Sequence, residues 1–447
     1  MCSSQLRRIV YTGPTVSYSF TQLELLTSLF DLHEILNKTR ESDASRLVPY
    51  RDFYNIRKVD THVHHSACMS QTHLLKFIKN KLLNHSQDIV CHRDGKDMSL
   101  AEVFESLHLS GADLSIDTLD MHAHNTFCRF DRFNLKYNPA GQSMLREIFL
   151  KTDNFIQGRY LAELTKEVIA DLEKNKYTIA EWRVSIYGTK PSEWSVLANW
   201  FYTNQLASEN VRWMIQIPRL FDSYRLRGDV KNFEELLHNI FDPLFEVTLN
   251  PESNVPLSYF LDTIVGFDSV DDESRPEFGT LSSGASSLPT PERWVEPVNP
   301  PYGYWLYYIY ANLCALNQLR SARGMSTFQF RPHCGEAGDP DHLISAYILA
   351  NEINHGIRLR KIPALQFLFY LSQVGIAMSP LSNNRLFLAV NKNPFPIFFK
   401  QGLNVSLSTD DPLLLHCTND PLVEEYSVAT QVWKLSPTDQ CEIARNR

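Results

Sequence analysis

The sequence predicts an α/β protein built on a (β/α)₈ barrel of the TIM type, with a helical N-terminal extension and loop insertions. From Tyr54 onward, short β-like runs alternate with helical stretches, which is typical of parallel α/β folds. A length of 447 residues would allow two or three ordinary domains, but α/β barrels often run this long as one domain. Polar residues suited to chemistry follow several predicted strands, as they do in barrel enzymes.

The expected division of the chain has two parts. Residues 1–50 form a weakly patterned extension, in which 20–36 could be one amphipathic helix, and residues 51–447 form the barrel. Residues 272–301, rich in serine and proline, are expected to be an exposed loop between two strands. The predicted strands cover residues 56–64, 179–187, 212–217, 327–331, 352–357, 375–378 and 404–407.

Two helix starts can be read from capping signals. Ser70 is a suitable N-cap for a helix whose apolar residues recur at helical spacing through Leu82. Asp420 and Pro421 predict the start of a last helix that runs to Leu435.

Composition excludes several classes of protein. The formal net charge is −8, so the basic surplus of a nucleic-acid-binding protein is missing. The eight cysteines contain no C-x-x-C pair, which favours reduced thiols in a cytosolic protein over a disulfide framework. No apolar run is long enough to predict a membrane span, and no signal peptide is recognisable, so we expect a cytoplasmic location.

His62 and His64 form an H-x-H pair at the end of the first predicted strand. Alternate side chains of a strand share one face, so both imidazoles can point at one metal ion, whereas His65 should face away. A lone H-x-H is structural about as often as it is functional, and it gains weight only from partners elsewhere in the chain.

Three further groups follow later strands. His333 and Glu336 stand three residues apart across a glycine, and His355 precedes Gly356. Asp410 and Asp411 follow an apolar strand, where two adjacent carboxylates are costly unless something positive neutralises them. Each group alone could be a loop or a helix cap. Together, three histidines and one aspartate make a zinc site open to one water, and a glutamic acid and a histidine could move protons beside it.

Four longer motifs resemble those of the AMP deaminase family, and plant members above all. They are Lys58–Met69, Arg331–Gly338, Ser379–Asn384 and Ser406–Leu413. The stretch Phe133–Pro139 resembles the segment that distinguishes AMP deaminases from adenosine deaminases. The resemblance runs from about residue 48 to the last residue.

The resemblance implies zinc-dependent hydrolytic deamination of AMP to IMP and ammonia, by attack of metal-bound hydroxide on purine C6, in purine salvage. One Zn²⁺ per subunit would be bound by His62, His64, His333 and Asp410. Glu336 would protonate the ring at N1, His355 would act as the base, and Asp411 would hydrogen-bond N7. The substrate-binding residues would be His64, Arg132, Phe133, Asn134, Leu135, Lys136, Tyr137, Glu336, Asp411, Pro412, Leu413 and Leu414. By the same resemblance we expect a homo-oligomer, either a dimer or a tetramer.

The phosphate of AMP would need cations in this acidic protein. Arg129, Arg132 and Lys136 form a local basic cluster, and arginine and lysine are natural phosphate ligands.

The chain departs from the family at several places. The family usually has serine at the position of Cys334 and glutamine at that of Leu414, and it continues for several dozen residues beyond Arg447. We therefore expect the C-terminal part of the family's domain to be missing from this chain.

Two other functions stay open at this point. The first is an adenosine or other aminopurine deaminase of the same barrel superfamily; a two-metal member would need a lysine on a middle strand, and 179–187 and 212–217 offer none well placed. The second is a catalytically impaired, truncated form that binds nucleotide or acts as a regulatory subunit.

Overall fold

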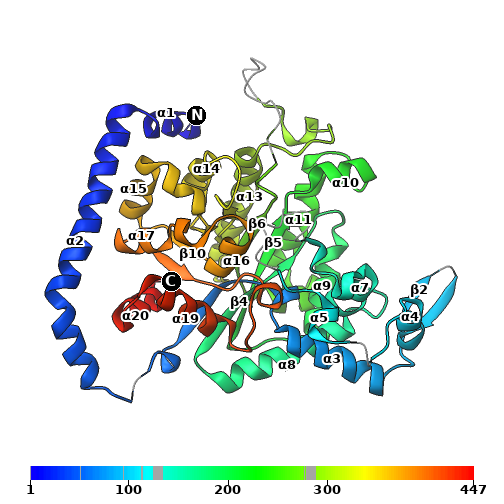
Figure 1. Ribbon diagram of the computed structural model, residues 1–447. Helices are drawn as coiled ribbons and strands as arrows, with labels where there is room; N and C mark the ends of the chain where they lie inside the picture. Colours follow the sequence, from blue (N-terminus) through cyan, green and yellow to red (C-terminus); the bar gives the residue numbers. More distant parts are fainter. Residues whose placement is uncertain are drawn as a thin grey trace.

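The computed structural model describes residues 2–50, 52–93, 95–111, 114–123, 134–275, 277 and 288–446. Within them, parallel strands form a barrel at the centre and helices surround it (Figure 1). The barrel strands are β1 (Lys58–His64), β4 (Thr178–Ser185), β5 (Val211–Pro218), β6 (Ile264–Val270), β7 (Gln329–Phe330), β8 (His333–Cys334), β9 (Glu352–His355), β10 (Gly375–Met378) and β11 (Val405–Leu407).

Strand pairing closes the barrel. The order is β1-β4-β5-β6-β7 in one sheet and β8-β9-β10-β11 in the other, with every pair parallel. Only Arg331 and Pro332 separate β7 from β8, so these are two halves of one strand that a residue without an N–H interrupts. At the seam, Asp410 donates its N–H to the carbonyl of His62 at 2.8 Å, and His64 donates to the carbonyl of Asp410 at 2.9 Å. The predicted barrel is therefore confirmed.

Helices connect the strands and cover the outside of the barrel. They are α3 (Gln71–Asn84), α4 (Leu100–Ser106), α5 (Ile116–Leu119), α7 (Ser143–Leu150), α8 (Arg159–Asn175), α9 (Ser192–Thr203), α10 (Phe221–Arg227), α11 (Phe233–Leu249), α12 (Val255–Leu261), α13 (Tyr302–Ala322), α14 (His342–Leu349), α15 (Pro363–Ser372), α16 (Pro380–Leu386), α17 (Phe395–Lys400), α18 (Pro412–Leu415), α19 (Pro421–Trp433) and α20 (Pro437–Arg445). A hairpin of β2 (Ile89–Arg93) and β3 (Lys96–Ser99) lies at one edge (Figure 1).

The capping signals agree with the structure at α3 and α19. The Ser70 side chain accepts a hydrogen bond from the N–H of His73, so it caps α3 as expected. Pro421 stands in the first turn of α19 as predicted, although the Asp420 side chain makes no capping hydrogen bond.

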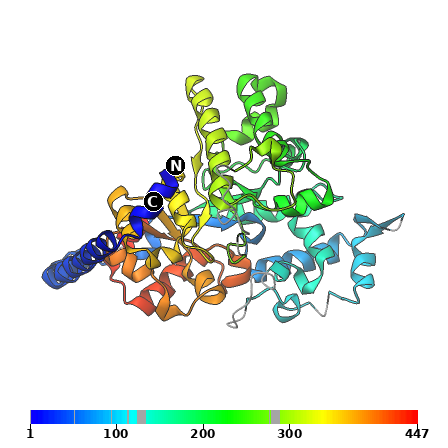
Figure 2. The same cartoon turned by 90° about the horizontal axis from the view of Figure 1, so that it is seen from above.

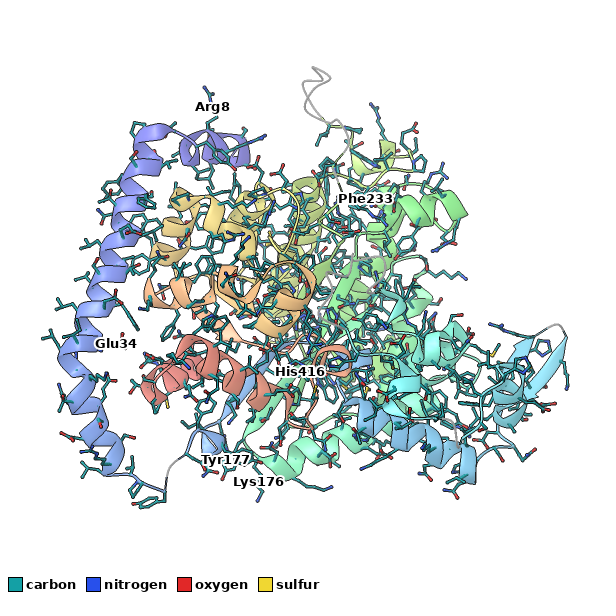
Figure 3. All side chains as sticks on the ribbon, viewed as in Figure 1. Arg8, Glu34, Lys176, Tyr177, Phe233 and His416 are labelled. Carbon is teal, nitrogen blue, oxygen red and sulfur yellow. The ribbon has the colours of Figure 1, made fainter. Side chains whose placement is uncertain are left out.

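The N-terminal extension consists of α1 (Cys2–Val10) and α2 (Gly13–Arg46), so its main helix is much longer than the predicted 20–36. α2 packs against α15 and α17, with the Phe30 and Phe399 ring centroids 5.7 Å apart. Residues 32–46 of this helix are almost all exposed, and α2 lies at the edge of the molecule (Figure 2). Glu34, on that helix, lies at the edge of the molecule, whereas His416 lies near its middle (Figure 3).

The side chain of His65 points away from His62 and His64, as the alternation of side chains along a strand predicts. Its ring packs on Trp182 and Trp213, and its Nε2 lies 2.8 Å from the Thr165 hydroxyl. None of the helices in the described residues is long and apolar enough to cross a membrane.

The loop after β6 is only partly as expected. It runs from β6 to the helix α13, which precedes the next strand, and its described residues Glu273 and Trp294 are buried. The loop therefore contributes to the interior as well as to the surface.

Candidate active site

A cavity of about 480 Å³ opens at the carboxyl ends of the barrel strands. It is lined by residues from loops and strand ends that are far apart in sequence, among them His64, His333, Glu336, His355 and Asp410. Its volume is in the range of small-molecule sites, and parallel barrels place their active sites at this end.

His62, His64 and Asp410 meet at the barrel seam. The Nε2 atoms of both histidines lie 3.2 Å from Oδ1 of Asp410. Ser382 donates its hydroxyl to the other oxygen, Oδ2, at 2.7 Å. Burial acts to raise the pKa of Asp410, but the two histidines lower it well below its usual range, so this carboxylate is ionised.

His333 is oriented by Asp268, which lies on β6. One oxygen of Asp268 accepts the backbone N–H of His333 at 3.0 Å and lies 2.9 Å from its Nδ1. Burial acts to raise the pKa of Asp268, but His333 and Arg183 lower it below its usual range. An ionised Asp268 accepts a hydrogen bond from the Nδ1–H of His333, so Nε2 of His333 is left free to bind a metal.

Arg183 neutralises the second oxygen of Asp268 from inside the barrel. Its Nε donates to Oδ2 at 2.5 Å, and its other nitrogens donate to the Thr61 carbonyl and the Asn354 side chain. Asn354 in turn donates to Asp268 at 3.1 Å. The buried ion pair is therefore hydrogen-bonded on both sides, which is the condition under which such pairs are tolerated.

Glu336 and His355 lie next to each other beside the His/Asp cluster, with Oε1 of Glu336 3.6 Å from Nδ1 of His355. The Asn383 amide nitrogen lies 3.5 Å from Oε1 of Glu336 and 3.2 Å from Nδ1 of His355. Burial and the charges of Asp410 and Glu273 raise the pKa of Glu336 well above its usual range, which favours the protonated form. Burial lowers the pKa of His355 to about 3, so this ring is neutral. One acid and one base thus stand side by side.

Glu273 holds the turn that carries Glu336. Its carboxylate accepts the N–H groups of Gly335 at 2.8 Å and of Glu336 at 3.3 Å. His342 lies between Glu273 and Glu277, 3.4 Å from each. The main chain of Glu273 approaches residue 338 so closely that only glycine fits there. At Gly338 φ is +63°, and a Cβ would lie 1.7 Å from the Glu273 carbonyl oxygen.

We expect the contact of His342 with Glu273 and Glu277 to make the free energy of unfolding depend on pH. Burial acts to lower the pKa of His342, but Glu273 and Glu277 raise it to about 9. A raised pKa contributes stability that is complete below the unfolded value near 6.5 and is lost as pH rises through 9, a loss on the order of 2 kcal/mol. Urea unfolding at pH 7 and pH 9.5 should show this decrease, and His342→Gln should show a smaller one. An equal decrease in both proteins would contradict the role of His342.

Asp411 is the remaining carboxyl in the cavity. The Tyr137 hydroxyl donates to its Oδ1 at 2.6 Å. Burial and the adjacent Asp410 raise the pKa of Asp411 to about 7. Asp411 can therefore carry a proton and donate a hydrogen bond to a ligand near neutral pH.

The sequence-predicted substrate residues lie in different surroundings. Asn134 and Tyr137 line the cavity, but Leu135 is 63% exposed and Lys136 pairs with Asp120, with 2.6 Å between Nζ and Oδ1. Pro412, Leu413 and Leu414 are buried and do not line this cavity. Arg129, Arg132 and Phe133 lie outside the described residues.

Sequence reasoning missed several residues of the site. Asp268 belongs to β6, a strand that was not predicted, although the run Ile264–Phe267 before it carries the same signal as the other strands. Arg183, Asn383 and Glu273 had no assigned role, because a buried arginine, an amide or a loop carboxylate has no recognisable spacing. His355 and Asp410 also adopt positive φ, +69° and +64°, which no pattern in the sequence announces.

The donor set fits a divalent metal ion. The ligand atoms of His62, His333, His355 and Asp410 lie within 4.8 Å of one another, and His64 groups with Asp410 and Asp411 in the same way. Among the described residues, Nδ1 and Nε2 of His62 and Oδ1 of Asp410 are buried and have no hydrogen-bond partner. Such atoms are costly unless something binds them, and imidazole with carboxylate is a donor set for zinc.

Known proteins resemble the chain over nearly its whole length. The AMP deaminase family profile matches residues 3–447. The AMP deaminase of Saccharomyces cerevisiae is 58% identical over 435 residues, which cover 97% of this chain and 53% of that protein. That of Arabidopsis thaliana is 57% identical over 440 residues, covering 98% and 52%. The chain spans about half the length of the curated relatives it matches.

Among solved structures, an adenine deaminase from Arthrobacter aurescens is 16% identical with a TM-score of 0.49, covering 88% of this chain and 92% of that one. The family match, in contrast, covers the barrel, the strand-end motifs and the cavity described above. The chain belongs to the AMP deaminase family.

Proposed function

We propose that the chain catalyses the hydrolytic deamination of AMP to IMP and ammonia with one Zn²⁺ ion. The observation that carries this proposal is the meeting, in one cavity, of a buried His/Asp cluster with the adjacent side chains of Glu336 and His355. The family supports AMP as the substrate, since the curated relatives are AMP deaminases.

His62, His64, His333 and Asp410 would hold the ion. His62 and His64 both approach the ionised Asp410, and Asp268 leaves Nε2 of His333 free. His355 lies near the same atoms, but Asn383 and Glu336 contact it, which suits a proton-transfer role better. A zinc ion at this point supplies a Lewis acid that brings the pKa of water towards neutrality.

The remaining residues would bind the purine and move protons. Glu336, whose raised pKa favours the protonated form, would donate a proton to ring nitrogen N1 as water adds to C6. The neutral His355 would accept the proton that the attacking water loses. Asp411 would donate a hydrogen bond to the acceptor N7, which its pKa of about 7 permits. The C6–N bond would then break as the amino group takes the proton held by His355 and leaves as ammonia, while the new C6 hydroxyl returns a proton to the Glu336 carboxylate and becomes the carbonyl of IMP.

Ammonia release from a purine panel tests the proposal. We expect zinc-loaded chain to release ammonia from AMP, with a higher kcat/KM than from adenosine, and to lose this activity in a chelator. Added Zn²⁺ should restore it. A preference for adenosine would contradict the nucleotide assignment. Zinc binding without any deamination would favour the regulatory alternative.

A further inference from the structure

Asp60 is a buried carboxylate that has no part in the proposed deamination. It lies on β1, two residues before His62. One of its oxygens, Oδ1, accepts the backbone N–H of Thr409 at 3.0 Å, and the other, Oδ2, accepts the Thr409 hydroxyl at 2.6 Å. Both oxygens therefore bind a single residue, the one that directly precedes the ligand candidate Asp410.

The backbone at Asp410 is strained. Its φ is +64°, in the left-handed region that is unfavourable for a residue with a Cβ. Such strain persists only where the surrounding contacts determine the conformation. On the strand side, Asp410 donates its N–H to the His62 carbonyl, and its own carbonyl accepts the N–H of His64. The contact of Asp60 with Thr409 fixes the residue before, so both ends of the peptide between 409 and 410 are held.

β1 therefore holds both parts of the His/Asp cluster. It carries His62 and His64, and through Asp60 it fixes the turn that carries Asp410. Oδ1 of Asp410 lies 3.2 Å from Nε2 of each histidine, a convergence that a metal ion requires. Thr409 is fully buried, so without Asp60 its N–H and hydroxyl would lose their partner where water does not reach. The turn would then relax, and Asp410 would move relative to the two histidines.

We propose that Asp60 is a positioning residue, which sets Asp410 against His62 and His64 through its two hydrogen bonds to Thr409; this rests on the proposed zinc site. The effect comes from the hydrogen bonds rather than from the charge, because each oxygen has a donor of Thr409 as its partner. An asparagine can keep both bonds. Its oxygen accepts the N–H, and its amide group donates to the Thr409 hydroxyl, which is also an acceptor.

The test measures zinc affinity, by competition with a chromophoric chelator, and the absorption spectrum of the cobalt-substituted chain. Asp60→Ala removes both hydrogen bonds and should weaken zinc binding by about 10- to 100-fold, as loss of a residue that orients a ligand does. Thr409→Val keeps the size of the side chain but loses its hydroxyl, and should weaken zinc binding by about 10-fold. Both should shift the cobalt d–d bands, because these bands report the geometry of the ligands.

Conservative variants and a matched control separate positioning from a general loss of packing. Asp60→Asn and Thr409→Ser keep both hydrogen bonds, so zinc affinity should stay within about 3-fold of the wild type and the cobalt spectrum should not change. Ser406→Ala is the control, because the Ser406 hydroxyl lies 3.4 Å from that of Thr61 at the same barrel seam. It should leave affinity and spectrum unchanged.

Wild-type affinity and spectrum in Asp60→Ala and Thr409→Val, even with lowered stability, would overturn the proposal. A loss in Asp60→Asn as large as in Asp60→Ala would assign the effect to charge and would overturn it as well. If Asp60→Ala does not fold, the pair Thr409→Val and Thr409→Ser decides. Zinc binding by a wild type that does not deaminate AMP would contradict the proposed function alone, and the affinities of the variants would still decide the role of Asp60. A wild type that binds no zinc would overturn both.

Discussion

Glu336→Gln is expected to abolish nearly all deamination while the chain keeps its metal. Glutamine has the same shape and retains an acceptor for Asn383, but it has no acidic proton to give to the purine ring. General acid catalysis contributes about 10²- to 10⁴-fold, so kcat should fall by that factor. Single-turnover ammonia release measures the loss, and mass spectrometry of the metal measures retention.

The control for Glu336→Gln is the same substitution at a glutamate outside the cavity. Glu105→Gln removes an exposed carboxylate of α4, far from the cavity lining, and should change neither quantity. Loss of zinc from Glu336→Gln would mean that Glu336 binds the metal. Turnover close to that of the wild type would show that another group supplies the proton.

Asp268→Ala is expected to have the largest effect on stability. The substitution leaves Arg183 buried without its carboxylate partner, and Arg183 has no exposed side-chain surface through which water could replace it. Removing one partner of a buried pair costs about 3–5 kcal/mol. The free energy of unfolding in urea should fall by that amount, provided that the metal is chelated in both proteins.

The same substitution should also weaken metal binding. His333 loses the acceptor that fixes its ring, and loss of such a partner typically lowers metal affinity by about 10- to 100-fold. Asp268→Asn is the informative companion, because it keeps the size and one acceptor oxygen but removes the charge. It should be intermediate in both measurements. Unfolding free energies equal to that of the wild type would contradict the structural role given to the Arg183–Asp268 pair.

The sequence predicts the barrel because its strands are short apolar runs that alternate with helical stretches. Gly375–Met378 matches its predicted bounds, and each end of β1, β4 and β5 lies within two residues of the predicted one. The ligand candidates were found for a related reason. His62, His64, His333 and Asp410 each follow or end such a run, and residues at the ends of parallel strands meet in space.

The supporting residues could not be predicted in this way, since their role exists only in three dimensions. Asp60 lies on a predicted strand, but its contact with Thr409 spans 349 residues of chain. Glu273 lies in a loop and contacts the 335–336 turn across 62 and 63 residues of chain. The long α2 was also underestimated, because much of its surface is exposed and its amphipathic pattern is weak.

The most direct test of the central claim is anomalous X-ray diffraction at the zinc edge from crystals of zinc-loaded chain. One anomalous peak should lie within bonding distance, about 2.0–2.2 Å, of nitrogens from His62, His64 and His333 and an oxygen from Asp410. A peak elsewhere, or no peak among these four side chains in zinc-saturated crystals, would contradict the site and the chemistry assigned to it.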